Sequence, residues 1–595
     1  MKQARSRPDG LALVYGLVCG SMALVVAGCS ASVGGSHPAN NNPPGAVAGG
    51  PGSGTGAGAA PGGATGSGAG AASGAAAASG AATAPGVVGG VVPPPAGGTD
   101  ALGTVAIANT RDKAVSRLTN SQFLHSAAAL LGDAAVTGVD ALLAEPDIQD
   151  GLFRNTGFAQ EQLYSVVQGY DAAATAMVAN VTDWPAFHQR WGGCTQSACL
   201  KAFLGTFIEA AFRRPATDAD VSAFQPILDA ATTNAISYDD TVQLLVRATL
   251  QAPEFLYLFF DATLNDYQIA TRLSYVITDG PPDAALYAAA KNHELSTSPG
   301  LDKQIDRLLA SGMTAFAQAF GFDYLDLRKA TTRNINQTST STAVDPTVVL
   351  QFVSSAVDSF AALVQGDQPI GSILTTDTFV VNPPTASWLA GQASTATMAR
   401  PTDAYPFMGL LTHPATLIAI SNAVFGSTVS RGQFIASQML CVPPTPPPPP
   451  GVQQTDLSAL LPPNPTARDY GEARMHDARC AGCHSQFESY SFALNKWGGD
   501  GLYKNDPQLK DNGPIMTGLG NISFDSFKDF LPKVAASTQF QRCLTDHVIR
   551  FALQHTEYPP ELVQTVLDGA RTGSATPTFR SLLRTLIRQP IFASR

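Results

Sequence analysis

The stretch Arg117-Leu-Thr-Asn-Ser-Gln-Phe-Leu-His-Ser-Ala-Ala-Ala-Leu-Leu-Gly132 indicates the fold class of this 595-residue chain. Thr119 is a helix-capping residue type, apolar side chains then recur at helical spacing, and Gly132 follows the last of them. The same pattern returns at 200–213, 240–249, 267–278, 301–310 and 347–364. Alternating strand patterns with tight hairpin dipeptides are scarce. The sequence therefore predicts a mainly α-helical, multidomain protein, with long loops around 337–342 and 376–404.

The first residues of the chain have the pattern of an export signal. Lys2, Arg5 and Arg7 precede an apolar run at 11–27, and small residues follow it. A basic start, a short apolar run and small residues before the cleavage point describe a secretory signal. The run is short for a membrane-spanning helix, which needs about 20 residues. An uncleaved anchor helix and an ordinary signal peptide remain as alternatives.

Cys29 stands directly after Ala27-Gly28, an arrangement that resembles a bacterial lipobox. Residues 1–28 would then be a lipoprotein signal peptide, and the thiol of Cys29 would carry the lipid. Ser30, in the place where Asp would retain a lipoprotein in the inner membrane, favours the outer membrane. We therefore expect a lipid-anchored envelope protein that faces the periplasm or the cell surface. No later segment predicts a transmembrane helix in the mature chain.

Residues 29–98 consist almost entirely of Gly, Ala, Ser, Pro, Thr and Val. Such a segment cannot bury enough apolar surface to offset the entropy of ordering its backbone, so we predict a disordered linker. The whole chain has 36 basic and 46 acidic residues, a formal net charge of −10, and no basic stripe. This balance argues against nucleic acid as a partner.

The motif Cys480-Ala-Gly-Cys483-His484 predicts covalent attachment of one haem c. Two thiols three residues apart lie on one face of a helical turn, where they can bond the two vinyl groups of a haem. His484 can then bind the iron as an axial ligand, and axial ligation sets the redox potential. Haem is attached outside the cytoplasm, which agrees with an exported chain.

Other interpretations of this motif stay open. A structural zinc site usually has four ligands, and no second Cys-x-x-Cys pair is present. A thioredoxin-type redox pair requires a βαβ context, whereas the context here is helical. A vestigial motif or a local disulfide remains possible. For a sixth iron ligand Met516 is the best candidate, His476, His547 and His555 are weaker ones, and an open iron is a further option.

The other cysteines suggest disulfides. Cys194 and Cys199 flank a four-residue loop, and in an oxidising compartment a bond between them is the natural assignment. Cys441 ends a predicted helix and Cys543 lies in the last helical region, so by elimination these two would pair. Two separate buried thiols are the alternative. Cys19 lies inside the signal and would be removed with it.

Residues 443–450 contain seven prolines in eight positions, which predicts a stiff polyproline II spacer. A docking ligand for the aromatic groove of a partner protein is the functional alternative. A spacer is favoured because the run joins two predicted folded parts of one chain. It separates a larger helical region from a smaller C-terminal region that holds the Cys-x-x-Cys-His motif.

Several separate motifs follow one another in an order that resembles a family of large exported bacterial proteins of unknown function. The family is the domain-of-unknown-function family fifteen-ninety-two with its linked domains and a planctomycete-type cytochrome c-like segment. The matching stretches are Arg117-Leu-Thr with Leu130-Leu-Gly132, Ala211-Phe-Arg-Arg-Pro-Ala-Thr217, Leu250-Gln-Ala-Pro-Glu-Phe-Leu-Tyr257, Ala270-Thr-Arg-Leu-Ser-Tyr275 with Pro282-Asp283, His413-Pro414, Ser430-Arg-Gly432, the proline run, His476 with Cys480 to His484, Ser491-Phe-Ala-Leu494, Phe579-Arg-Ser-Leu-Leu583 and Gln589-Pro-Ile-Phe592. The resemblance implies a helical multidomain architecture and brings no established reaction.

The chain departs from the family pattern after the haem motif. Members usually have Met-Asp-Pro where this chain has Phe487-Glu488-Ser489, and the usual Gly before Phe-Ala-Leu is Ser491. The Gly-Arg that commonly follows Tyr-Ala-Leu is absent after Phe551-Ala-Leu553. The attachment residues are intact, but the redox behaviour implied by the family becomes less certain and a vestigial motif gains weight.

Together these patterns predict five segments. They are a signal peptide at 1–28, a linker at 29–98, a helical body of unknown function at 99–440, a proline-rich hinge at 441–452, and a cytochrome c-like haem domain with C-terminal helices at 453–595.

Two functions from different classes are compatible with these segments. The first is an envelope c-type haem protein that transfers electrons to a protein partner, or serves as the redox subunit of an oxidoreductase complex. The alternative is a non-catalytic binding or scaffold lipoprotein with a vestigial haem motif. Hydrolase and nucleotide-binding motifs are missing. We expect the carboxylates of Asp239, Asp240, Asp500 and Asp511 to be solvated surface groups, so hydrolysis is only a weak third hypothesis.

Overall fold

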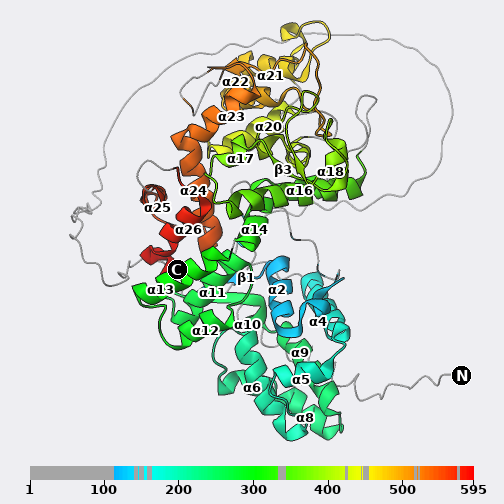
Figure 1. The fold of residues 1–595 in the computed structure, drawn as a ribbon, viewed down its shortest axis with the longest axis vertical. Coiled ribbons are helices and arrows are strands. Elements are labelled where there is room, and N and C mark those ends of the chain that lie inside the picture. Colours follow the sequence, from blue (N-terminus) through cyan, green and yellow to red (C-terminus); the bar gives the residue numbers. More distant parts are fainter. Residues whose placement is uncertain are drawn as a thin grey trace, which may run out of the picture. The chain divides into compact units, whose positions relative to one another are not determined.

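The computed structural model describes residues 113–594 apart from 140–141, 143–144, 146–152, 157–163, 312, 333–343, 422–426, 444, 446–454, 515–518, 520–522 and 572–575. All described residues belong to one compact unit. The predicted signal peptide with Cys29, the linker, the loop at 337–342, most of the proline run and Met516 lie outside them. The described part is mainly α-helical, as the sequence predicts (Figure 1).

The first helices form around a short two-stranded ribbon. The elements are β1 (Lys113–Arg117), α2 (Asn120–Leu131), α3 (Asp133–Val136), α4 (Tyr164–Asn180), α5 (Trp184–Arg190), α6 (Leu200–Ala211), α7 (Asp218–Ala223), α8 (Gln225–Thr233), α9 (Tyr238–Leu250), α10 (Pro253–Leu256) and β2 (Tyr257–Asp261). Helix α2 begins where predicted, because the side chain of Thr119 accepts a hydrogen bond from Gln122 N and the Gln122 side chain accepts one from Thr119 N. Strands β1 and β2 pair antiparallel, with Val115 opposite Phe259.

The middle of the chain adds further helices, several of which pack on α16. They are α11 (Asp266–Thr278), α12 (Ala284–Lys291), α13 (Ser298–Ala310), α14 (Thr314–Tyr324), α15 (Leu327–Thr332), α16 (Pro346–Gln365), α17 (Ser372–Thr375), α18 (Pro383–Trp388) and α19 (Pro414–Ala419). Helix α16 contacts α14, α15, α18 and α19. The segment 376–404, predicted as a loop, also contains α18 and a ribbon of β3 (Phe379–Val380) with β4 (Met398–Ala399). That part of the prediction was wrong, because such short elements leave no periodicity in the sequence.

Helix α16 is the described helix that is long and apolar enough to cross a membrane. Half of its most apolar window is buried inside the protein, as in the core helix of a folded domain. Length and composition alone are weak evidence for a span, so the absence of a transmembrane helix stays a prediction.

The last elements carry the predicted haem motif and close the core. They are α20 (Thr428–Phe434), the π-helical turn η5 (Ile435–Met439), η7 (Ser458–Leu460), α21 (Ala467–His476), α22 (Ala481–His484), the 3-10 helix η8 (Glu488–Leu494), β5 (Gly513–Pro514), β6 (Ser523–Phe524), α23 (Phe527–Ala536), α24 (Thr538–Leu553), α25 (Glu561–Ala570), α26 (Phe579–Ile587) and η9 (Pro590–Ala593). The orange and red helices α24 and α26 lie beside green helices of the middle group in Figure 1.

Aromatic rings join these distant parts of the sequence. Phe320 of α14 stacks on Phe153 with ring centroids 5.2 Å apart, and it also contacts Phe551 of α24 at 5.5 Å and Phe579 of α26 at 5.6 Å. Buried apolar side chains before and after the proline run therefore form one continuous hydrophobic core.

Candidate haem site

The two thiols of the Cys-x-x-Cys-His motif lie at the start of α22. Cys480 occupies the N-cap position of this short helix and is 8% exposed, whereas Cys483 is half-buried within it. Neither is bonded to the other or to another described cysteine. The helical turn therefore presents two thiols and the adjacent imidazole of His484.

His484 is held by a carboxylate on the next turn of the chain. Its Nδ1 lies 2.6 Å from Oε2 of Glu488, which stands four residues later and begins η8. Nε2 of His484 makes no hydrogen bond among the described residues. Because Nδ1 is hydrogen-bonded to Glu488, Nε2 is the nitrogen that would bind a haem iron.

Glu488 is fully buried (0% exposed) and has partners from two other helices. Its Oε1 accepts a hydrogen bond from Thr428 Oγ1 of α20 at 2.6 Å and is paired with the guanidinium of Arg474 of α21. Burial alone would raise the pKa of Glu488, but the hydrogen bonds from His484, Arg474 and Thr428 and the charge of Arg474 hold that pKa below its usual value. Glu488 therefore stays ionised as an acceptor.

Arg431 of α20 fixes the segment that follows η8. Its buried guanidinium donates to the carbonyl oxygens of Leu494, Trp497 and Gly498 at 2.8–2.9 Å. Burial lowers the pKa of Arg431 to about 10, so the side chain remains charged at neutral pH. These bonds tie three backbone carbonyl groups of the segment to α20.

Gly432, next to Arg431, allows a close approach of α20 to the haem-motif segment. A Cβ added here would lie 2.5 Å from the carbonyl oxygen of Phe487. The Ser430-Arg-Gly432 motif thus has a structural role, since Arg431 binds one end of the η8 region and Gly432 makes room for the other.

The donor set fits covalent haem. It consists of two unbonded thiols on one turn and an imidazole with one nitrogen held by a carboxylate and the other not hydrogen-bonded. A zinc site would require further ligands close to these three, and no group of His, Cys, Asp and Glu donors that includes Cys480 or Cys483 is present among the described residues. The residues therefore suit a c-type haem better than a structural metal ion.

The candidates for a sixth ligand are mostly placed elsewhere or engaged. Met516 lies outside the described residues. His476 is exposed, and its Nδ1 is 2.7 Å from the carbonyl oxygen of Glu472. His547 is buried in α24, and burial lowers its pKa to about 3. Its Nε2 lies 3.1 Å from the carbonyl oxygen of Gln438.

The cysteines outside the motif are bonded in the pairs that the sequence predicts. Cys194 is joined to Cys199, and Cys441 is joined to Cys543. The second bond connects the end of η5 to α24, across 102 residues that contain the haem motif. His547 Nε2 lies 3.9 Å from Cys441 Sγ, so these three side chains gather at one point where the disulfide occupies both sulfurs.

The four carboxylates considered for hydrolysis divide into two kinds. Asp239 and Asp240 are exposed at the start of α9, as predicted. Asp500 and Asp511 are buried, which corrects the expectation of solvated groups. Asp500 Oδ1 accepts from Leu502 N at 3.0 Å, and Asp511 Oδ1 pairs with Lys496 Nζ at 3.1 Å. Both stabilise loops by satisfying local donors, and no two of the four pair with each other.

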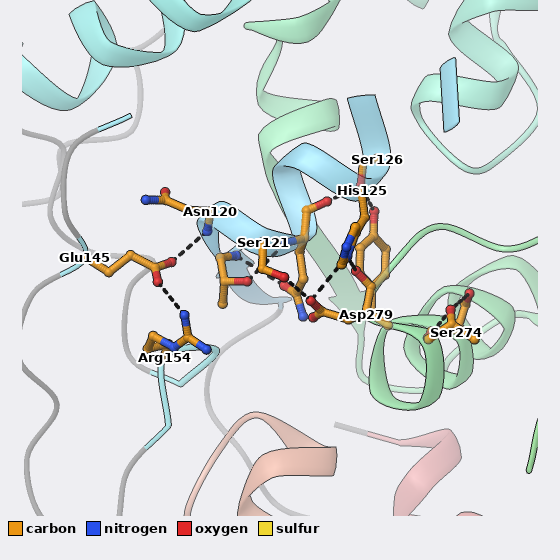
Figure 2. Close-up of polar contacts among 12 residues, drawn as sticks. Asn120, Ser121, His125, Ser126, Glu145, Arg154, Ser274 and Asp279 are labelled. Carbon is orange, nitrogen blue, oxygen red and sulfur yellow. Dashed lines mark hydrogen bonds and ion pairs between the residues drawn. The ribbon is translucent and has the colours of Figure 1, made fainter. Parts of the chain in front are cut away.

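A second histidine–carboxylate pair lies far from the motif in the sequence. Figure 2 shows His125 of α2 beside Asp279, the residue that ends α11. His125 Nδ1 is 2.9 Å from the Asp279 carbonyl oxygen and 3.3 Å from its Oδ2. Ser121 Oγ donates to the same Oδ2. Both Ser121 and the His125 nitrogen thus point to one carboxylate, and this is not the geometry in which a histidine activates a serine.

Comparison with family models gives matches along the chain. PSD5, a protein of unknown function (DUF1595), matches residues 199–259, and PSD4, a protein of unknown function (DUF1592), matches residues 264–389. PSCyt3, a protein of unknown function (DUF1588), matches residues 408–507. These three matches agree with the multidomain family of unknown function that the order of the motifs indicates.

The PSCyt3 segment, residues 408–507, contains α20, the Cys480–His484 motif and η8, and is the cytochrome c-like domain of the family. Glu488, Arg431, Arg474 and Thr428 all lie within it, so the network around His484 belongs to one matched segment. Searches among curated proteins and among solved structures found no match.

The network around His484 was only partly visible in the sequence. The four-residue spacing of His484 and Glu488 was a usable signal, because residues four apart on helical turns can meet. Arg474 and Thr428 had no such signal. Their contacts with Glu488 arise only when α20 and α21 pack against η8.

Proposed function

We propose that this protein is a lipid-anchored c-type haem protein of the bacterial envelope that transfers electrons to or from a protein partner. One observation carries the proposal. Two unbonded thiols stand on one helical turn beside an imidazole whose Nδ1 is held by a buried carboxylate. The cytochrome c-like PSCyt3 match over the same residues supports it.

The residues of the motif would act in separate roles. Cys480 and Cys483 would hold the haem through two thioether bonds, each S–H adding across one vinyl group with no net oxidation. His484 would hold the iron through Nε2. Glu488 holds Nδ1, and Arg431 fixes the backbone behind η8. The bound haem supplies a one-electron iron centre.

The test is haem attachment to the exported, full-length chain made together with the haem-attachment machinery. We expect a c-type reduced-minus-oxidised spectrum and a haem stain that survives denaturation, the stain being lost when Cys480→Ala is combined with Cys483→Ala. The matched control is Cys194→Ala with Cys199→Ala, which removes two disulfide-bonded cysteines far from the motif in the sequence and should keep the haem. A folded, colourless wild-type protein with Cys480 and Cys483 free or bonded to each other would contradict the proposal and favour the scaffold alternative.

The envelope location rests on the leader and on Cys29. We propose that Cys29 is acylated and that the chain is held at the outer membrane. Metabolic labelling with a radioactive fatty acid should label the wild type and not Cys29→Ala, and the variant should leave the membrane fraction. Unchanged membrane association together with absent label would contradict the anchor.

A further inference from the structure

The buried carboxylate beside His484 is placed to influence an iron bound on the other side of the ring. Glu488 Oε2 is 2.6 Å from Nδ1, and Nε2 faces away from that contact as the second nitrogen of the imidazole. Iron-bound histidines almost always donate their second N–H, and a carboxylate acceptor makes the imidazole more basic. We propose that Glu488 is a positioning residue that strengthens electron donation from His484 to the haem iron and so favours the oxidised iron. This inference rests on the proposed function.

The surroundings of Glu488 hold it in one orientation. The side chain is 0% exposed, and Oε1 is fixed by Thr428 Oγ1 at 2.6 Å and by Arg474. Oε2 is thereby directed to His484. Because water is excluded, this charge-assisted hydrogen bond is stronger than an exposed one would be. Its strength depends on neighbouring groups that the chain itself supplies.

Arg474 opposes this effect. Its guanidinium contacts both Glu488 oxygens, with Nε 3.1 Å from Oε2. The positive charge draws electron density away from the oxygen that accepts from His484. The geometry therefore predicts opposite shifts when the two side chains are neutralised, whereas a merely structural pair would lose stability in both variants without opposite shifts.

The experiment compares the holoprotein with Glu488→Gln by spectroelectrochemistry and by resonance Raman after photolysis of the carbon monoxide adduct. The glutamine side chain has nearly the same shape as that of Glu488 and carries no charge. At a fixed potential the ratio of reduced to oxidised haem should rise about tenfold, which is about 59 mV for a one-electron couple. The iron–histidine stretching frequency should fall, because the Nδ1 hydrogen bond is weaker.

Two further variants separate this effect from a general change of charge. Glu472→Gln removes one carboxylate from α21 that pairs with Arg468 and does not touch His484, so the iron–histidine frequency should stay at the wild-type value. Arg474→Gln should move the frequency upward and the potential downward. If Glu488→Gln does not fold, the double variant Glu488→Gln with Arg474→Met removes the unpaired buried charge and should still show the lower frequency.

The outcomes test the role of Glu488 separately from the proposed haem function. A haem protein whose frequency is the same in wild type and in the Glu488 variants would overturn the inference and leave the proposed function standing. A wild-type protein without covalent haem would overturn both.

Discussion

Two of the histidine–carboxylate pairs, His484 with Glu488 and His125 with Asp279, are alike in residue type and differ in their surroundings. The first pair comes from one stretch of chain, and its carboxylate is buried with Arg474 and Thr428. The second joins residues 154 positions apart, and its histidine side chain is 51% exposed. Figure 2 shows that the carboxylate of Asp279 also accepts a hydrogen bond from the hydroxyl of Ser121.

The difference teaches what makes a histidine–carboxylate pair a candidate site. A carboxylate on Nδ1 is common to both pairs, so it does not by itself indicate a ligand. Both carboxylates are buried, but only His484 has two unbonded thiols before it, and only Glu488 is also paired with an arginine. The two thiols therefore indicate haem attachment, and the carboxylate would modify how strongly the histidine donates electrons to the iron.

The largest effect should come from replacing the two histidines in turn. His484→Gln removes the proposed axial ligand and should abolish the wild-type reduced haem spectrum. His125→Gln should leave that spectrum unchanged, because His125 lies beside neither thiol. Absorption spectra of the two purified variants check the comparison. An equal loss of the haem spectrum in both variants would contradict the distinction between the two histidines.

The next largest effect should follow removal of the disulfide that encloses the first pair. Cys441→Ser with Cys543→Ser opens a loop of about 100 residues and should lower the free energy of unfolding by about 4.7 kcal/mol in the chain-entropy account. Cys194→Ser with Cys199→Ser opens a loop of a few residues that contains neither pair and should cost about 2 kcal/mol. Urea unfolding of the two variants measures both losses, provided that the unfolding free energy depends equally steeply on urea concentration in each. A larger loss in the short loop would contradict the entropic account.

Removal of Arg431 should weaken the support behind Glu488. Arg431→Met removes the guanidinium bonds to the carbonyl oxygens of Leu494, Trp497 and Gly498, and we expect a loss of about 3 kcal/mol in unfolding free energy. The exposed Arg400, paired with Asp377, provides the control. Arg400→Met should stay within about 0.5 kcal/mol of wild type. Similar values for the two variants would show that Arg431 does not anchor the segment.

The smallest effect should be the pH dependence of the second pair. The hydrogen bond to Asp279 raises the pKa of His125 above its usual value, while partial burial opposes the rise. A raised folded-state pKa adds stability that is fully present below about pH 6.5 and is lost as the pH rises through the folded value. The contribution should stay below about 1 kcal/mol, because the side chain is half exposed. Unfolding of wild type and His125→Gln at pH 5.5 and pH 8 should differ more at the lower pH.

Much of the fold could be predicted from local patterns. Capping by Thr119 placed α2, and apolar periodicity placed α6, α9, α11, α13 and α16 within a few residues of their observed ends. Short elements escaped, as α18 and the β3–β4 ribbon show, since a few residues carry no period. Asp500 and Asp511 were misjudged because burial of a carboxylate depends on donors that the neighbouring chain brings to it.

The roles of several family motifs also depended on packing. His413 is an example, since its Nδ1 accepts from Ala415 N and its Nε2 lies 3.0 Å from Ser355 Oγ. Burial lowers its pKa to about 3, so it is a neutral structural residue. Arg272 likewise donates to the carbonyl oxygen of Phe592 near the end of the chain. The structural roles of His413 and Arg272 could not be predicted from the residue spacing within their motifs.

The sequence by itself determined the helical class, the positions of the long helices and the donor atoms of the Cys-x-x-Cys-His motif, because periodicity, caps and neighbouring residues act over a few positions. The tertiary structure alone decided which groups surround His484. Thr428, Arg431 and Arg474 reach the η8 region from helices that are distant or separate in the chain. Buried polar groups must find partners wherever the fold brings them, and long-range packing rather than local spacing selects those partners.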